Sequence, residues 1–230
     1  MVDLNLLFLE YRKKGHDLSS PKEIRSGKEA VVYRVEQAGK AYALKVYKKP
    51  EVRAFARNEQ YLDGTFRKNH SLRKAISKGN AFSKGFLSSS WVKREFDILK
   101  NLNKHGAGIP EVIDWTSSSI LMEFVGDDDA APRLIDIELE PADAKKAFDS
   151  IIDSVSLFLK TGIVHSDLSA YNILWWKERP YIIDFPQAID IRQNPNTNDL
   201  LKRDIDNVIK YFEKVIEIDK ECIYLRFKLN

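Results

Sequence analysis

One short stretch, residues 163–174 with the sequence IVHSDLSAYNIL, constrains this chain more than any other part of it. It places Asp167 and Asn172 on a loop between apolar runs, and Asp184 follows in a second apolar-flanked segment. An aspartate can orient a hydroxyl group or a water, while an amide oxygen and a second carboxylate are hard ligands of the kind that Mg²⁺ prefers. A histidine and an aspartate two residues apart, such as His165 and Asp167, would by themselves indicate only a capped loop. Asp167, Asn172 and Asp184 together predict a site for phosphoryl transfer.

Length, charge and cysteine content bound the remaining possibilities. The 230 residues suffice for one large domain or for two lobes that share a cleft. With 37 Lys and Arg against 34 Asp and Glu, the net charge of +3 does not by itself indicate a nucleic-acid partner. Cys222 is the single cysteine, and the sequence shows neither a signal peptide nor an apolar run that could span a bilayer. We therefore expect a cytoplasmic protein without a membrane partner.

The N-terminal third changes from helical to strand periodicity. Residues 1–22 read as an amphipathic helix followed by a polar linker, because Leu4, Leu7, Phe8 and Tyr11 recur at helical spacing. From residue 24 the period becomes two, and a turn at residues 37–40 indicates a β-hairpin. The turn that contains Ser26, Gly27 and Lys28 precedes this hairpin, and its N–H groups could face phosphate, although such a turn standing alone more often reflects plain hairpin geometry.

Lys45 is the most informative residue of the hairpin. It lies inside the apolar run AYALKVY, where a lysine must either point to solvent or find a partner. Beside a phosphoryl-transfer motif, it is expected to bind the nucleotide phosphates and to be held by a glutamate on a helix. Glu95 is the candidate partner, and Glu59 is the alternative.

A basic segment follows the hairpin and precedes the next helix. Between residues 48 and 93 the cations far outnumber the three acidic residues Glu51, Glu59 and Asp63. Glycines and serines in the same segment predict a partly mobile insertion over about residues 51–90. Such an insertion could contact RNA, an acidic partner or the nucleotide, and a solvated charged face is the equally supported alternative.

The second half of the chain reads as a strand followed mainly by helices. The strand at residues 120–124 runs into a crossing between two lobes, where Met122, Glu123 and Val125 would present backbone groups to an adenine edge. Helices are predicted over residues 141–160 and from residue 200 to 216, and a final edge strand over 223–229. His165 is expected to be a packed residue that orients the loop rather than a base.

These motifs resemble the RIO-type atypical protein kinases, in particular the compact prokaryotic members without a winged helix. The likeness runs from about residue 24 to 212 and includes SGKEAVVY, ALKVYK, MEFVG with APRL, HSDLSAYNIL, IIDFPQA and LLKRDIDNV. It implies an α+β, bilobal protein-kinase-like fold with a small N-terminal β-rich lobe and a trimmed, mostly α-helical C-terminal lobe. The whole chain, 1–230, would be one domain, with lobes at 23–125 and 126–230.

The resemblance also implies roles for individual residues. Asp167 and Asp184 would be catalytic, Asn172 and Asp184 would bind the metal, and Lys45 with Glu95 would anchor phosphate. The cofactor would be ATP with Mg²⁺, or alternatively Mn²⁺. A second set would bind the nucleotide, over its phosphates and at its adenine: Ser26, Gly27, Lys28, Met122, Glu123 and Val125.

Two departures from ordinary protein kinases bear on the acceptor. Ser166 replaces the arginine that would pair with a phosphorylated activation loop, and Pro186 stands where a glycine is usual. Few residues separate Asp184 from the helix near Leu200, which leaves little room to dock a peptide.

The resemblance therefore implies a serine/threonine kinase that phosphorylates itself or others, or an ATPase, linked to small ribosomal subunit maturation. The alternatives are a nucleotide-regulated module that binds ribosomal RNA or an assembly factor, and a small-molecule kinase. The physiological acceptor and the oligomeric state stay open.

Overall fold

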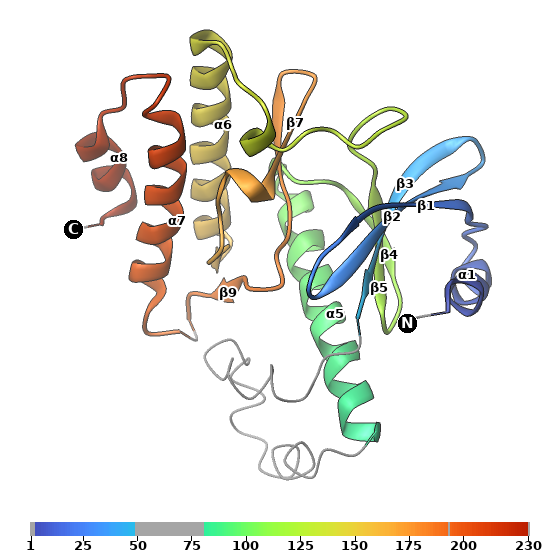
Figure 1. The fold of residues 1–230 in the computed structure, drawn as a ribbon. Helices are drawn as coiled ribbons and strands as arrows, with labels where there is room; N and C mark the ends of the chain where they lie inside the picture. Colours follow the sequence, from blue (N-terminus) through green and yellow to red (C-terminus); the bar gives the residue numbers. More distant parts are fainter. Residues whose placement is uncertain (1–2, 49–80, 193, 230) are drawn as a thin grey trace. The chain divides into compact units, whose positions relative to one another are not determined.

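The computed structural model describes residues 3–48, 81–192 and 194–229, with side chains described from residue 89 in the second range. These residues form two compact units. The N-terminal unit comprises the described parts of Met1–Lys100 together with Glu111–Phe124 and Asp128–Ala130. The C-terminal unit comprises Asn101–Pro110, Val125–Asp127 and the described part of Ala131–Asn230. The first unit is built on a sheet and the second mainly on helices, which confirms the predicted α+β class (Figure 1).

A five-stranded sheet forms the N-terminal unit, in the order β1-β2-β3-β5-β4 with every neighbouring pair antiparallel. The strands are β1 Ser19–Ser26, β2 Ala30–Gln37, β3 Lys40–Tyr47, β4 Val112–Trp115 and β5 Ser119–Glu123. Ala38 and Gly39 both have positive φ, 50° and 76°, as a two-residue hairpin turn between β2 and β3 requires. The predicted hairpin is therefore confirmed.

The first strand was missed in the sequence, where residues 16–22 read as polar linker. β1 instead begins at Ser19 and pairs with β2 from Ser19 to Ser26. Its side chains are exposed at every position except Ile24, which is half-buried. Because an edge strand of this kind buries no face, it carries no alternation that could reveal it.

Two helices contribute to the N-terminal unit. Helix α1, Leu4–Lys13, buries Leu7 and Tyr11 in a cluster that includes Leu44 and Val46 of β3 and Leu121 of β5. Helix α5, Ala81–Lys104, contacts the sheet through Phe96, whose ring centroid lies 6.2 Å from that of Trp115. Most of the predicted basic insertion lies outside the described residues, and from Ala81 onward that segment is helical.

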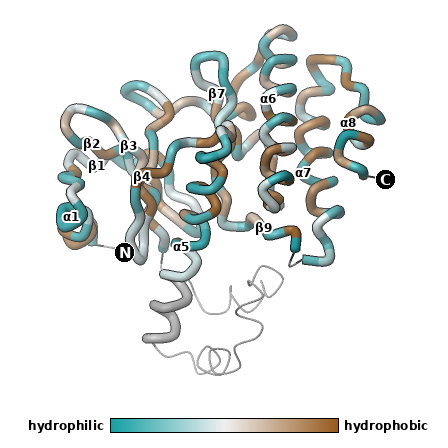
Figure 2. Tube along the Cα trace, turned by 180° about the vertical axis from the view of Figure 1, so that it is seen from behind, coloured by the Kyte–Doolittle hydropathy of each residue, from teal (hydrophilic) through white to brown (hydrophobic). Residues whose placement is uncertain are grey.

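The C-terminal unit is organised around α6, Pro141–Lys160, and α7, Thr197–Phe212, which lie side by side (Figure 1). Apolar and polar segments alternate along both helices (Figure 2), and Phe148 packs edge-to-face on Phe212 at 5.7 Å between ring centroids. The shorter elements are η2 Leu134–Asp136, β6 Ile163–Val164, η3 Ala170–Asn172, β7 Ile173–Trp176, β8 Arg179–Ile182, β9 Ile189–Asp190 and α8 Lys220–Phe227. β6 pairs with β9, and β7 pairs with β8.

The edge strand predicted over residues 223–229 is wrong, because Lys220–Phe227 is the helix α8. Asp219 caps its first turn by accepting a hydrogen bond from the N–H of Cys222, and Lys228 ends it in a left-handed conformation. The apparent alternation did not reflect burial, since Leu225 is 77% exposed while Phe227 is buried. Among the helices in the described ranges, none is long and apolar enough to cross a membrane.

Candidate functional site

Lys45 lies on the face of β3 opposite to the one that packs on α1. Leu44 and Val46 point into the α1 cluster, so the strand's period of two directs Lys45 and Tyr47 to the other face. The Lys45 and Glu95 side chains are only 11% and 4% exposed, and Lys45 Nζ donates to Glu95 Oε1 at 2.8 Å. A buried charge needs such a partner, and the predicted pairing of Lys45 with Glu95 is confirmed. The alternative partner, Glu59, lies outside the described residues.

Tyr47 completes this pair and was missed in the sequence. Its hydroxyl donates to Glu95 Oε2 at 2.5 Å, and its ring lies 5.3 Å from Lys45 Nζ. Glu95 therefore accepts one hydrogen bond on each oxygen, which holds its carboxylate in one orientation. The signal was present in ALKVYK, because a residue two positions after Lys45 on a strand shares its face.

The turn between β1 and β2 carries Ser26, Gly27 and Lys28. Lys48 Nζ donates to Ser26 Oγ at 3.0 Å and to the Gly27 carbonyl at 2.6 Å, which ties the turn to the end of β3. The Gly27 N–H donates to the Ala30 carbonyl at 2.8 Å. Lys28 is exposed. The turn is thus tied to β3, and a phosphate-binding role for it remains a prediction.

The three residues expected at the adenine fall in different units. Met122 and Glu123 end β5 in the N-terminal unit, where the Glu123 N–H donates to the Glu111 carbonyl at 2.7 Å. Val125 begins a segment of the C-terminal unit, and its carbonyl accepts from the Ala131 N–H at 2.9 Å. Their contact with a base remains a prediction.

His165 starts the loop that bears Asp167 and is almost fully buried. The Asp167 N–H donates to His165 Nδ1 at 3.3 Å, so this nitrogen carries no proton, and Nε2 donates to the Ile183 carbonyl at 3.0 Å. The imidazole also lies 4.5 Å from the Phe185 ring. His165 thereby joins the Asp167 loop to the segment that bears Asp184, which confirms that it is a packed, orienting residue.

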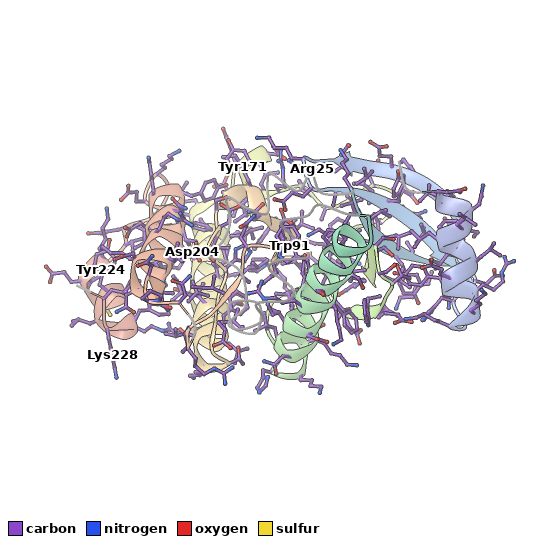
Figure 3. The ribbon with its side chains drawn as sticks, turned by 90° about the horizontal axis from the view of Figure 1, so that it is seen from below. Arg25, Trp91, Tyr171, Asp204, Tyr224 and Lys228 are labelled. Atoms are coloured by element: carbon purple, nitrogen blue, oxygen red, sulfur yellow. The ribbon has the colours of Figure 1, made fainter. Side chains whose placement is uncertain are left out.

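Asp204 of α7 holds the same loop from the other side and was missed in the sequence. Its carboxylate accepts the Ser166 N–H at 2.7 Å and the Leu168 N–H at 3.0 Å, the two residues that flank Asp167. Asp204 is almost fully buried, on the side of α7 that faces the rest of the unit (Figure 3). Burial raises the pKa of its carboxyl group to about 7, against the opposing effect of the two N–H donors.

Asn172 and Asp184 are brought together by the β7–β8 pair. Ile173 is paired with Ile182, and the Ile183 N–H donates to the Asn172 carbonyl at 2.9 Å. Asn172 Nδ2 donates to the Asp167 carbonyl at 2.8 Å, so the amide nitrogen faces the loop and Oδ1 is the atom left to serve as a ligand. Asp167 and Asp184 are both exposed, and Asp184 has φ +71°, a strained value that is common at functional sites.

This donor set fits a hard cation that is bound together with phosphate. In the described part of the chain, no group of three His, Cys, Asp or Glu side chains could hold a metal ion alone. Asn172 and Asp184 offer one amide oxygen and one carboxylate, and Mg²⁺ typically completes such a set with substrate phosphates and water. The residues therefore fit a nucleotide-bound Mg²⁺ rather than a metal cage made only of protein.

Ser166, which departs from the kinase pattern, is firmly packed. It is almost fully buried with φ +60°, its Oγ donates to the Gln187 carbonyl at 2.7 Å, and Arg203 Nη2 donates to its carbonyl. The segment after Asp184 then pairs at once with β6, through Ile189 and Asp190. The arginine that would read a phosphorylated loop is replaced by a serine that serves packing.

Comparison with known proteins shows which family this chain is similar to. The model of the RIO domain matches residues 31–222. Similar proteins include the serine/threonine-protein kinase rio1 of Schizosaccharomyces pombe, 32% identical over 84% of this chain and 38% of its own length. The human serine/threonine-protein kinase RIO1 is 31% identical over 82% of this chain and 32% of its own length.

A compact relative is similar over most of its length. The RIO-type serine/threonine-protein kinase Rio1 of Thermoplasma acidophilum is 32% identical over 66% of this chain and 83% of its own length. This chain thus spans well under half of the human and Schizosaccharomyces pombe relatives but most of the archaeal one. Lys45, Glu95, Asp167, Asn172 and Asp184 all fall inside the matched range, and the chain belongs to the RIO family.

Proposed function

We propose that this chain is an ATP- and Mg²⁺-dependent atypical serine/threonine kinase that also phosphorylates itself. The observation that carries the proposal is the hydrogen-bonded loop of Asp167, which Asp204 and His165 hold in place and which lies beside Asn172 and the strained Asp184. The names of the matched relatives, which are serine/threonine-protein kinases, support it.

Each residue has a distinct task in the proposed reaction. Asp167 accepts the proton of the acceptor hydroxyl group. The oxygen of that hydroxyl group bonds to the γ-phosphorus, and the bond between the γ-phosphorus and the β–γ bridging oxygen breaks, which releases ADP. Asn172 and Asp184 hold Mg²⁺, or alternatively Mn²⁺, which neutralises charge on the phosphates when bound. Lys45, oriented by Glu95, binds the phosphates, Ser26, Gly27 and Lys28 lie over them, and Met122, Glu123 and Val125 contact adenine.

We further propose that the chain is one RIO kinase domain with lobes at 23–125 and 126–230, acting in the cytoplasm in small ribosomal subunit maturation. The excess of Lys and Arg between residues 48 and 93 supports contact with ribosomal RNA or an assembly factor. The single cysteine supports a reducing compartment.

An ATPase cycle is the second candidate, because one feature favours it. The chain after Asp184 turns directly into β9, which pairs with β6, and then into α7 at Thr197. This path leaves only a short segment on which an acceptor peptide could dock. Water could therefore replace a protein hydroxyl group as the phosphoryl acceptor.

ATP turnover in Asp184→Asn tests the enzymatic proposal. We expect a loss of about 100-fold or more in Mg²⁺-dependent turnover, since the carboxylate ligand is removed while its shape is kept. Asp149→Asn, at an exposed position on α6, is the matched control and should retain the wild-type rate. Equal turnover in the wild type and Asp184→Asn would refute the proposal.

The stability of labelled phosphate on the protein separates the two candidates. After incubation with ATP labelled at the γ-position, a label that survives hydroxylamine indicates phosphoserine or phosphothreonine and supports the kinase. A hydroxylamine-labile label indicates an acyl phosphate on an aspartate, and it supports an ATPase cycle in which water hydrolyses this intermediate.

A further inference from the structure

A groove of about 730 Å³ lies in the C-terminal unit away from the residues discussed so far. Its walls are α6, the connection between α5 and β4, the start of β8, and Arg226 of α8. Asp167, Asn172 and Asp184 do not line it. The groove is therefore a separate feature of the same unit.

The floor of the groove is apolar and is held in shape by its backbone. Ile109, Leu157, Pro180 and Tyr181 line it; Ile109 and Pro180 are buried, whereas Leu157 and Tyr181 are half-buried. The Ile182 N–H donates to the Gly108 carbonyl at 2.8 Å, which attaches the α5–β4 connection to β8. A Cβ atom at Gly108 would lie 3.0 Å from Ser154 Oγ, so the connection approaches α6 as closely as a glycine permits.

The serines in the wall do not require a ligand. Ser154 Oγ donates to the Ser150 carbonyl at 2.9 Å, and Ser156 Oγ donates to the Ile152 carbonyl at 2.9 Å. Because these hydroxyl groups are already paired within α6, recognition by the groove must depend on its floor and on its charged rim.

The rim is cationic. Arg226 Nη2 pairs with Asp153 Oδ1 at 2.7 Å, so these two charges offset one another. Lys160 and Arg179 are exposed, and neither forms an ion pair within the described ranges. Two uncompensated cations therefore stand over an apolar floor.

We propose that this groove docks an acidic segment of a partner protein, with carboxylates on Lys160 and Arg179 and an apolar side chain on the floor. A nucleic acid fits less well, because it carries a charge at every phosphate and binds continuous rows of cations, often with stacking aromatics. Here Asp153 interrupts the rim, and a single aromatic ring, that of Tyr181, lines the groove, so there is no row of stacking aromatics. Long cationic side chains around an apolar floor suit a peptide that has few charges and one apolar anchor.

A peptide-binding experiment tests this assignment. A fluorescein-labelled peptide of repeating Glu-Glu-Leu is titrated with the full chain in the absence of nucleotide, and binding is measured by fluorescence anisotropy. The comparison variant is Lys160→Glu/Arg179→Glu, in which both positions are exposed and fold stability should be kept. The matched control is Lys210→Glu/Lys214→Glu, which changes the net charge by the same amount at exposed positions outside the groove. Thermal unfolding of each variant shows that it is folded.

We expect the groove variant to bind at least about 10-fold more weakly than the wild type, because each rim charge changes from attraction to repulsion. The control variant should bind as the wild type does, and a Gln-Gln-Leu peptide should bind weakly to all three. Equal weakening in both variants would mean attraction by net charge alone and would overturn the proposal. A labelled single-stranded RNA that binds more tightly than the peptide, and is lost in the groove variant, would overturn it in favour of a nucleic-acid surface.

Discussion

Asp204 shows how a single buried carboxylate can hold the loop that bears Asp167. It accepts the N–H groups on both sides of Asp167, and Asn207 Nδ2 adds a third bond to the Leu168 carbonyl at 3.0 Å. Burial raises the pKa of Asp204 to about 7, while the N–H donors and the neighbouring Arg203 favour its charged form. The loop is thus best held when this carboxyl group is ionised, although burial makes ionisation costly.

The pH dependence of stability should reveal this balance. The folded-state pKa of Asp204 lies above its ordinary value near 4, so the folded state binds more protons than the unfolded state between about pH 4 and about pH 7. Its contribution to the free energy of unfolding should therefore fall as pH rises through that window, by up to about 4 kcal/mol. Asp204→Asn has no carboxyl group to titrate and should lose this part of the dependence.

Denaturant unfolding across that pH range measures the effect, with the exposed Asp199→Asn as control. Identical pH profiles for the wild type and Asp204→Asn would contradict this account of the loop.

At the level of elements, the two faces of β3 have different roles: one packs against α1, and the other presents Lys45 and Tyr47 to α5. Leu44 and Val46 pack toward α1, whereas Lys45 and Tyr47 bond to Glu95 of α5. Tyr11 of α1 adds a buried hydrogen bond of 2.9 Å to Ser119 of β5. Helix α1 therefore covers the face of the strand that is opposite to Lys45, and its packing fixes which way Lys45 points.

Two neighbouring leucines of α1 offer a direct test of this support. Leu7 is 2% exposed and Leu6 is 61% exposed, so both lose the same atoms on change to alanine but only Leu7 leaves a cavity. We expect Leu7→Ala to lower the free energy of unfolding by about 2–5 kcal/mol and Leu6→Ala by no more than about 0.5 kcal/mol. Chemical denaturation of both variants measures these changes. Similar losses of unfolding free energy in the two variants would mean that α1 does not dock as described.

At the level of the whole molecule, the proposed ligands of ATP are distributed over both units. Lys45 and Glu95 belong to the N-terminal unit, and Asp167, Asn172 and Asp184 belong to the C-terminal unit. Each unit has its own buried residues, so each can hold its own candidate side chains in place. Variants in one unit can therefore test its residues without changing the residues of the other.

Thermal unfolding with and without ATP and Mg²⁺ measures how much the residues of each unit contribute to nucleotide binding. A ligand at about 100 times its Kd stabilises the folded state by about 2.7 kcal/mol, which corresponds to roughly 5–10 °C in Tm for a chain of this size. Lys45→Met should lose most of that shift, and Asp184→Asn should lose the part that needs Mg²⁺. The shift within each variant is the quantity to compare, because Lys45→Met also leaves Glu95 without its cation.

Much of the site was predictable because its chemistry demands particular residue types at short spacing. Asp167 and Asn172 lie on one loop, and Lys45 stood out as a charge inside an apolar run. Asp204 was harder to find, although a carboxylate at helical spacing between the buried Leu201 and Val208 was a usable signal. It escaped notice because its partners lie far away along the chain, in the Asp167 loop.

The amino-acid sequence by itself determined the α+β class, the hairpin and the major helices, and it singled out the residues proposed for phosphoryl transfer, since each follows from local periodicity or from a compact motif. Only the tertiary structure decided the exposed strand β1, the helix α8, and the bonds that Asp204, His165 and Tyr47 make. Those features depend on contacts between distant segments and on caps that outweigh an apparent alternation. The loop of Asp167 can therefore be predicted from the sequence, whereas the side chains that hold it in place can be identified only from the folded structure.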